Sequence, residues 1–438
     1  MMGVVFLVFV LLGIGRNLPF TDLYFFGLGV ADLLFSILAA SLLLGPSLNR
    51  EIRVLRTPTI ATTLISVIAF ISMALNAPVY GAELKDVFEI LKYLYLVAVM
   101  VVSSYYTRRM GLVPALGFVV GVIVSGIVAF LNPMNPDILG TLQIYNPNVI
   151  GNVLSVSIVF CSFAILGGYP VIGGFLAICA ASIAFFTFSK GAWLMSIFGL
   201  IACYLAATNF GARNAGLATS YKKNVVYVLL GGLLAAVYLF WDVISLIVQA
   251  KIAATDFESS AAEGGSVSAR AGLILSAIYM FMLNPVFGVG ISNFEHVNNL
   301  LQDELGDAYY EDDNPNSAWF YVLGCMGLPA FIVFSWMFYW FLSRVYRISL
   351  LNQKVRALYT TCVGIVFFIG GNVQVEMLTA YYYWVTLGVV AALSTRGLLK
   401  KVIAGGKMDD AFARPLIGGG VARRDALLSG GDSDRSMS

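Results

Sequence analysis

The sequence predicts an all-α membrane protein that crosses the bilayer about twelve times. Hydrophobic residues make up 59% and charged residues 11% of the 438 residues, whereas soluble domains carry about 25% charged residues. The mean hydropathy is +0.86. Apolar runs recur along nearly the whole chain, and many have the length of about 20 residues that a bilayer core requires. They lack the period-two alternation of outer-membrane barrels.

The apolar runs place the expected spans in chain order. They cover residues 2–15, 23–45, 58–76, 87–106, 111–131, 149–167, 169–188, 191–208, 225–249, 317–342, 358–375 and 380–395. The first run is short for a span, and it has neither a basic start nor an A-x-A site, so we do not expect a cleaved signal peptide. We expect one membrane domain over 1–406, and a tail over 407–438 that is too polar to build a core and is disordered.

Lysine and arginine are unevenly divided between alternate loops, and this division orients the spans. One set of loops contains Arg50, Arg53, Arg56, Arg108, Arg109, Arg213, Lys222, Lys223, Arg344, Arg347, Lys354, Arg356, Arg396, Lys400 and Lys401. The other set contains only Arg16, Lys85, Lys251 and Arg270, with Lys190 at a helix junction. Both termini are therefore expected in the cytoplasm. The long polar loop at about 250–316 faces outward, which in a bacterial inner membrane is the periplasm.

The composition excludes several other function classes. A net charge of +2 without a basic aromatic stripe gives no indication of nucleic-acid binding. The five cysteines all lie within apolar runs, where they predict helix packing rather than disulfides or metal ligation. We therefore expect no cofactor and no metal.

Two cations in or beside the outward-facing segments are candidates for binding an anion. Arg270 precedes a short apolar run, Ala271 to Leu283, which cannot span the bilayer and predicts a re-entrant or interfacial helix. Asn284-Pro285 ends this run, and two glycines after it permit tight backbone geometry. Lys190 lies in a very short outward junction between two spans. The alternatives are an ion pair between Arg270 and a loop carboxylate, such as that of Glu263, and a lysine that only snorkels.

Further polar and aromatic residues lie on the same expected surface. Asp312 and Asp313 directly precede a span, where a carboxylate could act as general base for a sugar hydroxyl. His296, the only histidine, is a weaker candidate for that role. Residues expected to contact substrate are Glu295, His296, Asn316, Ser317, Trp319, Gln374 and Glu376.

Three sequence blocks resemble the O-antigen ligase/polymerase superfamily of bacterial inner-membrane glycosyltransferases. They are SKGAW (189–193), SARAGLILSAIYMFMLNPVFGVGISNF (268–294) and NSAWFYVLGCMGLPA (316–330). Family members usually have an arginine at the position of Lys190, so the charge is kept here but the two-pronged geometry is lost. Ligase-type members have a histidine at the position of Asn316, and asparagine cannot exchange a proton near neutral pH.

The resemblance implies a polymerase of undecaprenyl-diphosphate-linked repeat units that makes O-antigen or exopolysaccharide at the periplasmic face. Donor and acceptor would both be lipid-linked glycans in the membrane, and no metal would be needed. Lys190 and Arg270 would bind the diphosphate, and Asp312 or Asp313 would assist the attacking hydroxyl. A chain-length regulator and a flippase are possible partners.

Two other functions stay open at this stage. One is a ligase that transfers finished polymer to lipid A-core or another acceptor, against which Asn316 argues. The other is a polysaccharide transporter or flippase, which would be expected to bury ionisable residues near the bilayer midplane. Only Asp32, Lys92 and Asp242 are candidates for such a position.

Overall fold

The structure is a computed structural model that describes most of the apolar part of the chain. It describes residues 2–14, 30–43, 48–81, 84–131, 147–167, 169–187, 189–213, 266–305, 315–348, 353–373, 378 and 380–395. The helices in these ranges are α1 (Met2–Ile14), α2 (Val30–Leu43), α3 (Leu48–Val54), α4 (Arg56–Tyr80), α5 (Leu84–Met110), α6 (Val113–Leu131), α7 (Pro147–Leu166), α8 (Pro170–Phe186), α9 (Lys190–Arg213), α13 (Ser266–Leu283), α14 (Phe294–Leu300), α15 (Gln302–Leu305), α16 (Ala318–Ile348), α17 (Gln353–Val373) and α18 (Tyr381–Leu393).

The helices confirm an all-α, multi-pass membrane protein. Within the described ranges, α4, α5, α7, α9, α16 and α17 are long and apolar enough to cross a bilayer, and α1, α6, α8, α13 and α18 are shorter apolar helices. Each expected span outside 225–249 overlaps one of the helices, although residues 23–29 and 44–45 of the span expected at 23–45 lie outside the described residues. The span expected at 225–249 and the tail at 407–438 lie outside the described residues.

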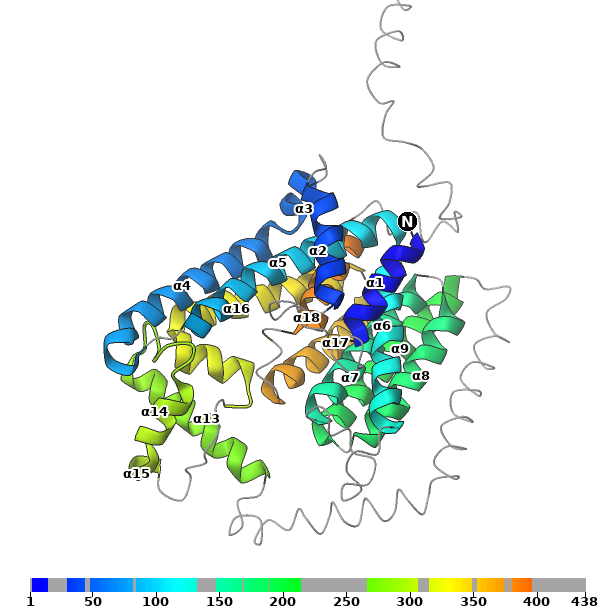
Figure 1. The fold of residues 1–438 in the computed structure, drawn as a ribbon. Helices are drawn as coiled ribbons and strands as arrows, with labels where there is room; N and C mark the ends of the chain where they lie inside the picture. Colours follow the sequence, from blue (N-terminus) through cyan, green and yellow to red (C-terminus); the bar gives the residue numbers. More distant parts are fainter. Residues whose placement is uncertain are drawn as a thin grey trace, which may run out of the picture.

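The helices form two differently inclined groups (Figure 1). One group contains α1 and α6 to α9, in which α7 packs against both α8 and α9 and α1 packs against α6. In the other group, α4 packs against α5 and α16, and α5 also packs against α18. The helix α17 joins the groups because it contacts α7 and α9 on one side and α16 on the other.

The first helix is held by an unusually close approach to α6. A Cβ on Gly121 would lie 2.0 Å from the carbonyl oxygen of Val10, and one on Gly13 would lie 2.3 Å from that of Phe118. Small residues allow such backbone contact between membrane helices, where packing replaces the hydrophobic effect. The short apolar run at the N-terminus is therefore a packed helix of the bundle.

The expected span at 317–342 is two arms of a broken helix. Gly327 has φ 79° and ψ −177° inside α16, and Pro329 follows it without an N–H group. The two arms fold back on each other, because the Trp319 ring lies 4.7 Å from that of Phe334 and 5.2 Å from that of Phe338. The hydropathy pattern predicted one straight span because it does not register a left-handed residue.

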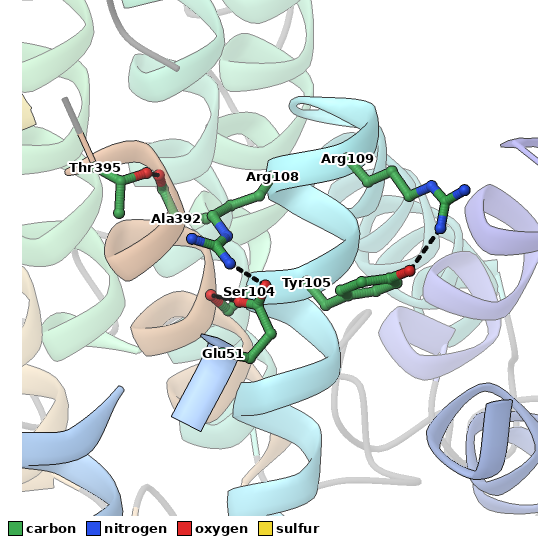
Figure 2. A network of polar contacts seen from close by, with 7 residues as sticks. All are labelled: Glu51, Ser104, Tyr105, Arg108, Arg109, Ala392 and Thr395. Atoms are coloured by element: carbon green, nitrogen blue, oxygen red, sulfur yellow. Dashed lines mark hydrogen bonds and ion pairs between the residues drawn. The ribbon is translucent and has the colours of Figure 1, made fainter. Parts of the chain in front are cut away.

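A buried ion pair joins two helices, α3 and α5, at one end of the bundle (Figure 2). The Arg108 guanidinium of α5 binds the Glu51 carboxylate of α3, and Ser104 Oγ donates to the same carboxylate at 3.2 Å. The last turn of α18, with Thr395 just beyond it, lies beside this pair. We call this end the basic end, because it also carries Arg53, Arg56, Arg109, Arg344 and Arg347.

The register between α4 and α16 shows that Arg56 and Arg344 belong to the same end. Thr62 Oγ1 lies 3.9 Å from the Met337 sulfur where the two antiparallel helices meet. Arg56 lies about two turns before this contact in α4, and Arg344 lies about two turns after it in α16.

Candidate functional site

Lys190 is the first residue of α9, at the tight junction with α8 that the sequence predicted. The junction is held by Trp193, whose Nε1 donates to the Phe185 carbonyl oxygen at 2.8 Å. The rings of these two residues also stack, with centroids 5.0 Å apart and planes inclined by 13°. The Lys190 side chain is exposed. A binding site requires that its side chains stand on a rigid backbone. The contacts between Trp193 and Phe185 give the exposed Lys190 such a support.

The start of α7 lies against this junction. A Cβ on Gly151 would lie 2.4 Å from the Ala192 Cβ, so α7 and α9 touch where the two helices begin. One turn further along, Ser155 Oγ donates to the Ala192 carbonyl oxygen at 3.0 Å and lies 3.0 Å from Ser196 Oγ. The two helices therefore run parallel, and their N-termini lie together.

Arg270 is half-buried in α13, which begins at Ser266, four residues before the arginine. The sequence placed Arg270 at the start of the helix, but the unpaired N–H groups of the first turn belong to the residues before it. Arg270 can therefore contribute its guanidinium but not its own backbone N–H. Burial lowers the pKa of Arg270, although arginine stays charged at neutral pH. Glu263, its alternative partner, lies outside the described residues.

The first arm of α16 runs beside α13 in the same direction. A Cβ on Gly324 would lie 2.8 Å from the Ala277 carbonyl oxygen, and Leu328 N donates to the Pro285 carbonyl oxygen at 2.9 Å. Arg270 and Ser317 lie the same number of residues before the contact between Ala277 and Gly324. With the same rise per residue on both helices, Arg270 and Ser317 are at about the same level.

Asn316 and Ser317 form the start of α16, and both have special geometry. Within the described ranges, Asn316 is the one non-glycine residue with positive φ, at 50°. Ser317 is buried, and its Oγ donates towards the Gly371 carbonyl oxygen at 3.4 Å and Asn372 Oδ1 at 3.3 Å. The same Oγ accepts from Phe320 N at 3.5 Å, in the manner of an N-cap. The start of α16 is thus fixed to the end of α17.

The register of α7 and α17 brings Lys190 to the same end. Ser162 Oγ lies 2.7 Å from the Tyr359 hydroxyl, where these antiparallel helices meet. Asn372 lies about as many residues after Tyr359 in α17 as the start of α7 lies before Ser162. Asn372 is therefore level with the start of α7, which touches the junction that carries Lys190. Lys190, Arg270 and Asn316 therefore lie at one end of the bundle, which we call the site end.

The turn after α13 has the backbone geometry that its glycines predicted. Gly288 and Gly290 have φ values of 64° and 105°. Val289 N donates to the Gly324 carbonyl oxygen at 3.1 Å, and Gly290 N donates to that of Cys325 at 3.0 Å. The break in α16 frees these carbonyl groups, so the turn replaces the helix's own hydrogen bonds. Irregular backbone at membrane depth requires such compensation.

Three polar side chains complete this turn, and we did not identify two of them, Ser72 and Asn76, from the sequence. Ser72 Oγ donates to the Phe287 carbonyl oxygen at 2.5 Å and to that of Cys325 at 3.1 Å. Asn76 Nδ2 donates to the Gly288 carbonyl oxygen at 3.0 Å, and the Tyr321 hydroxyl donates to that of Ile291. The sequence signal that could have identified Ser72 and Asn76 is their spacing, because they are two polar residues four positions apart in an apolar helix.

The remaining candidates are more scattered. Glu295 and His296 are exposed on α14, and the His296 ring meets that of Tyr80 edge-on at 5.7 Å. Trp319 turns inward, to an aromatic cluster, rather than outward. Asp312, Asp313, Gln374 and Glu376 lie outside the described residues. In the part of the chain that the structure describes, no three His, Cys, Asp or Glu side chains gather as a metal site would need.

Comparison with protein families gives a match to part of the chain. The family model described as Wzy_C, O-antigen ligase, matches residues 175–335. This segment contains Lys190, Arg270 and Asn316, together with the turn and the broken helix. A comparison with curated proteins gives no match. The family match agrees with the resemblance of the three sequence blocks, because both indicate that residues 175–335 are similar to the O-antigen ligase/polymerase superfamily.

Proposed function

We propose that this protein is a glycosyltransferase that polymerises undecaprenyl-diphosphate-linked oligosaccharide repeat units at the periplasmic face of the inner membrane. The observation that supports the proposal is that Lys190, Arg270 and Asn316 lie at the same end of the bundle, in α9, in α13 and just before α16 of the matched segment. Two cations supply the charge that a lipid diphosphate needs. Asparagine at the position of the ligase-type histidine favours polymerisation.

The proposed step is a displacement at a sugar. A hydroxyl oxygen of the acceptor repeat unit attacks the anomeric carbon of the donor glycan, and the bond from that carbon to the diphosphate oxygen breaks. The diphosphate leaves with the bonding electron pair, still attached to its lipid. The hydroxyl proton passes to a carboxylate, which we assign to Asp312 or Asp313 because they precede α16 directly.

Lys190 and Arg270 would stabilise the charge that develops on the departing diphosphate. Fixed cations are most effective where negative charge increases in the transition state. The rigid junction below Lys190 and the register that holds Arg270 level with Ser317 both keep these cations in place. Arg270 can bind two phosphate oxygens at once through its planar fork, whereas Lys190 acts as a point charge.

A ligase is the second candidate, and the description of the matching family model favours it. The same donor and the same cations would serve, but the acceptor would be lipid A-core or another molecule. The arrangement of the site end fits both reactions. The products distinguish them, because a polymerase makes a ladder of lengths and a ligase joins one polymer to one acceptor.

The decisive experiment incubates the purified full-length protein with undecaprenyl-diphosphate-linked repeat units and separates the products by length. We expect a ladder with the wild type and a loss of at least about 100-fold in rate for Arg270→Ala, because removing one transition-state contact commonly costs that much. Arg270→Lys should keep part of the activity. Arg109→Gln, which removes a cation at the basic end, is the matched control and should keep the full rate.

Three results would overturn the proposal. A ladder of unchanged rate with both Arg270→Ala and Lys190→Ala would remove these cations from the reaction. Transfer onto added lipid A-core without any ladder would establish the ligase instead. Movement of the substrate across liposomes without bond formation would support the transporter that the sequence left open.

A further inference from the structure

Asn372, the residue before the last in α17, is connected to the surroundings of both cations at the site end. Its Oδ1 accepts a hydrogen bond from Ser317 Oγ at 3.3 Å, and Ser317 is at about the same level as Arg270. Asn372 is also level with the start of α7, which touches the junction that carries Lys190. A ligand that is held by both cations therefore lies at the level of the Asn372 side chain.

The Asn372 amide is held in one orientation and keeps an N–H group for a further partner. Its Nδ2 donates to the Phe368 carbonyl oxygen at 3.0 Å, while Oδ1 accepts from the Ser317 hydroxyl. An amide nitrogen carries two hydrogens. Among the described residues, no second group accepts a hydrogen bond from Asn372, and the side chain is only half-buried. The site end therefore contains a fixed, neutral hydrogen-bond donor.

An aromatic ring lies next to this amide on the same face of α17. Phe368 comes four residues before Asn372, and helical side chains with this spacing lie one above the other. The Phe368 side chain is 51% exposed. It also meets the Trp319 ring of α16, with centroids 5.7 Å apart and planes inclined by 46°. Trp319 thus supports the Phe368 ring, which stays partly open beside the amide.

The pairing of a neutral amide with an open ring matches the chemistry of a sugar. A sugar ring has hydroxyl groups around its rim and apolar C–H groups on its faces. The N–H group of Asn372 can donate to a hydroxyl, and the negative face of an aromatic ring attracts C–H groups. Residues 314–375 contain no aspartate or glutamate, so neither α16 nor α17 adds a negative charge that would repel a diphosphate at Lys190 and Arg270.

We propose that Asn372 and Phe368 form a subsite for the sugar that is bonded to the diphosphate of the donor. The second N–H of Asn372 donates to a hydroxyl of this sugar, and the Phe368 ring packs against a C–H face of it. The inference rests on the proposed function, because it takes a lipid-linked glycan as the donor. It applies to the polymerase and to the ligase alike, since both use that donor.

The test compares the binding of two radiolabelled lipids to the purified full-length protein in detergent micelles, in the cold so that turnover is slow. One is the undecaprenyl-diphosphate-linked repeat unit, and the other is undecaprenyl diphosphate without a sugar. We expect the wild type to bind the first lipid more tightly. Asn372→Ala should weaken binding of the repeat unit about fivefold, as expected for one hydrogen bond, and leave binding of undecaprenyl diphosphate unchanged.

Matched variants separate the sugar from the diphosphate and from the lipid tail. Phe368→Leu keeps an apolar side chain but removes the ring, so it should weaken binding of the repeat unit alone. Phe175→Leu is its control, because Phe175 is 65% exposed on α8 and should not affect either lipid. Arg270→Ala should weaken binding of both lipids, since they share the diphosphate. Phe368→Leu also provides the test if Asn372→Ala does not fold in micelles.

Four results would overturn the inference. The first is equal binding of the two lipids by the wild type, and the second is unchanged binding in both Asn372→Ala and Phe368→Leu. The third is an equal loss for both lipids in Asn372→Ala, which would place its effect on the diphosphate or on the fold. The fourth is a loss in Phe175→Leu as large as in Phe368→Leu, which would assign both rings to the lipid tail.

The binding experiment is independent of the proposed function. If the wild type discriminates the two lipids through Asn372 and Phe368 but makes no ladder and transfers no polymer, the subsite stands and the proposed reaction fails. If it makes a ladder and one of the four results above is found, polymerisation stands and the subsite fails.

Discussion

Asn76 of α4 donates a hydrogen bond from Nδ2 to the carbonyl oxygen of Gly288 at 3.0 Å, across 212 residues of sequence. Its second Nδ2 bond, to the Ser72 carbonyl oxygen at 2.8 Å, stays within α4. Gly288 lies in the turn that connects α13 to α14 and replaces the missing hydrogen bonds of α16. A helix from the first quarter of the chain therefore fixes the segment that carries Arg270.

Replacing Asn76 by alanine should loosen this turn. The Gly288 carbonyl group would lose the side-chain donor from α4, which costs about 1–3 kcal/mol when the group stays buried. We expect a lower thermal unfolding midpoint and faster hydrogen exchange in 284–293. Thr63→Ala is the matched control, since its Oγ1 bonds only the Thr59 carbonyl oxygen of the same helix. An unchanged midpoint for Asn76→Ala would show that this bond is dispensable.

Gly327→Ala should have a larger effect than Asn76→Ala. Its φ of 79° is unfavourable for alanine, and the new Cβ would lie 2.3 Å from the Val286 carbonyl oxygen. Backbone strain of this kind costs about 1–3 kcal/mol before the collision is counted. We expect little folded protein, measured as the monodisperse fraction after detergent extraction. Gly174→Ala, where a Cβ would meet no atom within 4 Å, should extract like the wild type.

The expected spans, the α8–α9 junction and the end of α13 could be predicted from local properties of the sequence. Lys190 at the α8–α9 junction and the stop at Asn284-Pro285 are such cases, because hydropathy and proline act over a few residues. The fold-back at Gly327 and the bonds from Ser72 and Asn76 depend on contacts between distant segments. Trp319 illustrates the same limit: we expected it to contact substrate, yet its ring packs against Phe334 and Phe338 in an aromatic cluster.

Gly121→Ala should separate α1 from α6. The methyl group would lie 2.0 Å from the Val10 carbonyl oxygen, so the two backbones would have to move apart. Because membrane helices associate through close packing, a loss of contact along the whole pair is expected. Hydrogen exchange of the α1 backbone measures it and should be faster than in the wild type. Gly3→Ala is the control, since a Cβ there meets no atom within 4 Å. Equal exchange in both variants would contradict the prediction.

Replacing one residue of the ion pair between Glu51 and Arg108 should destabilise the protein, whereas replacing both residues should not. Their side chains are 3% and 13% exposed, so Glu51→Ala leaves the guanidinium without its partner in a buried position. Removing one partner of a buried pair costs about 3–5 kcal/mol, whereas replacing both by apolar residues is often neutral. We therefore expect a clearly lower unfolding midpoint for Glu51→Ala.

The double variant E51L/R108M should recover most of the midpoint lost in Glu51→Ala, because no unpaired charge then remains. Arg109→Gln is the matched single change on the same turn of α5, and it should alter the midpoint little, since Arg109 is exposed and its guanidinium contacts the Tyr105 side chain. A double variant as unstable as Glu51→Ala would show that the pair also determines how α3 is placed against α5. In that case Ser104, the third member of the network, becomes the next residue to replace.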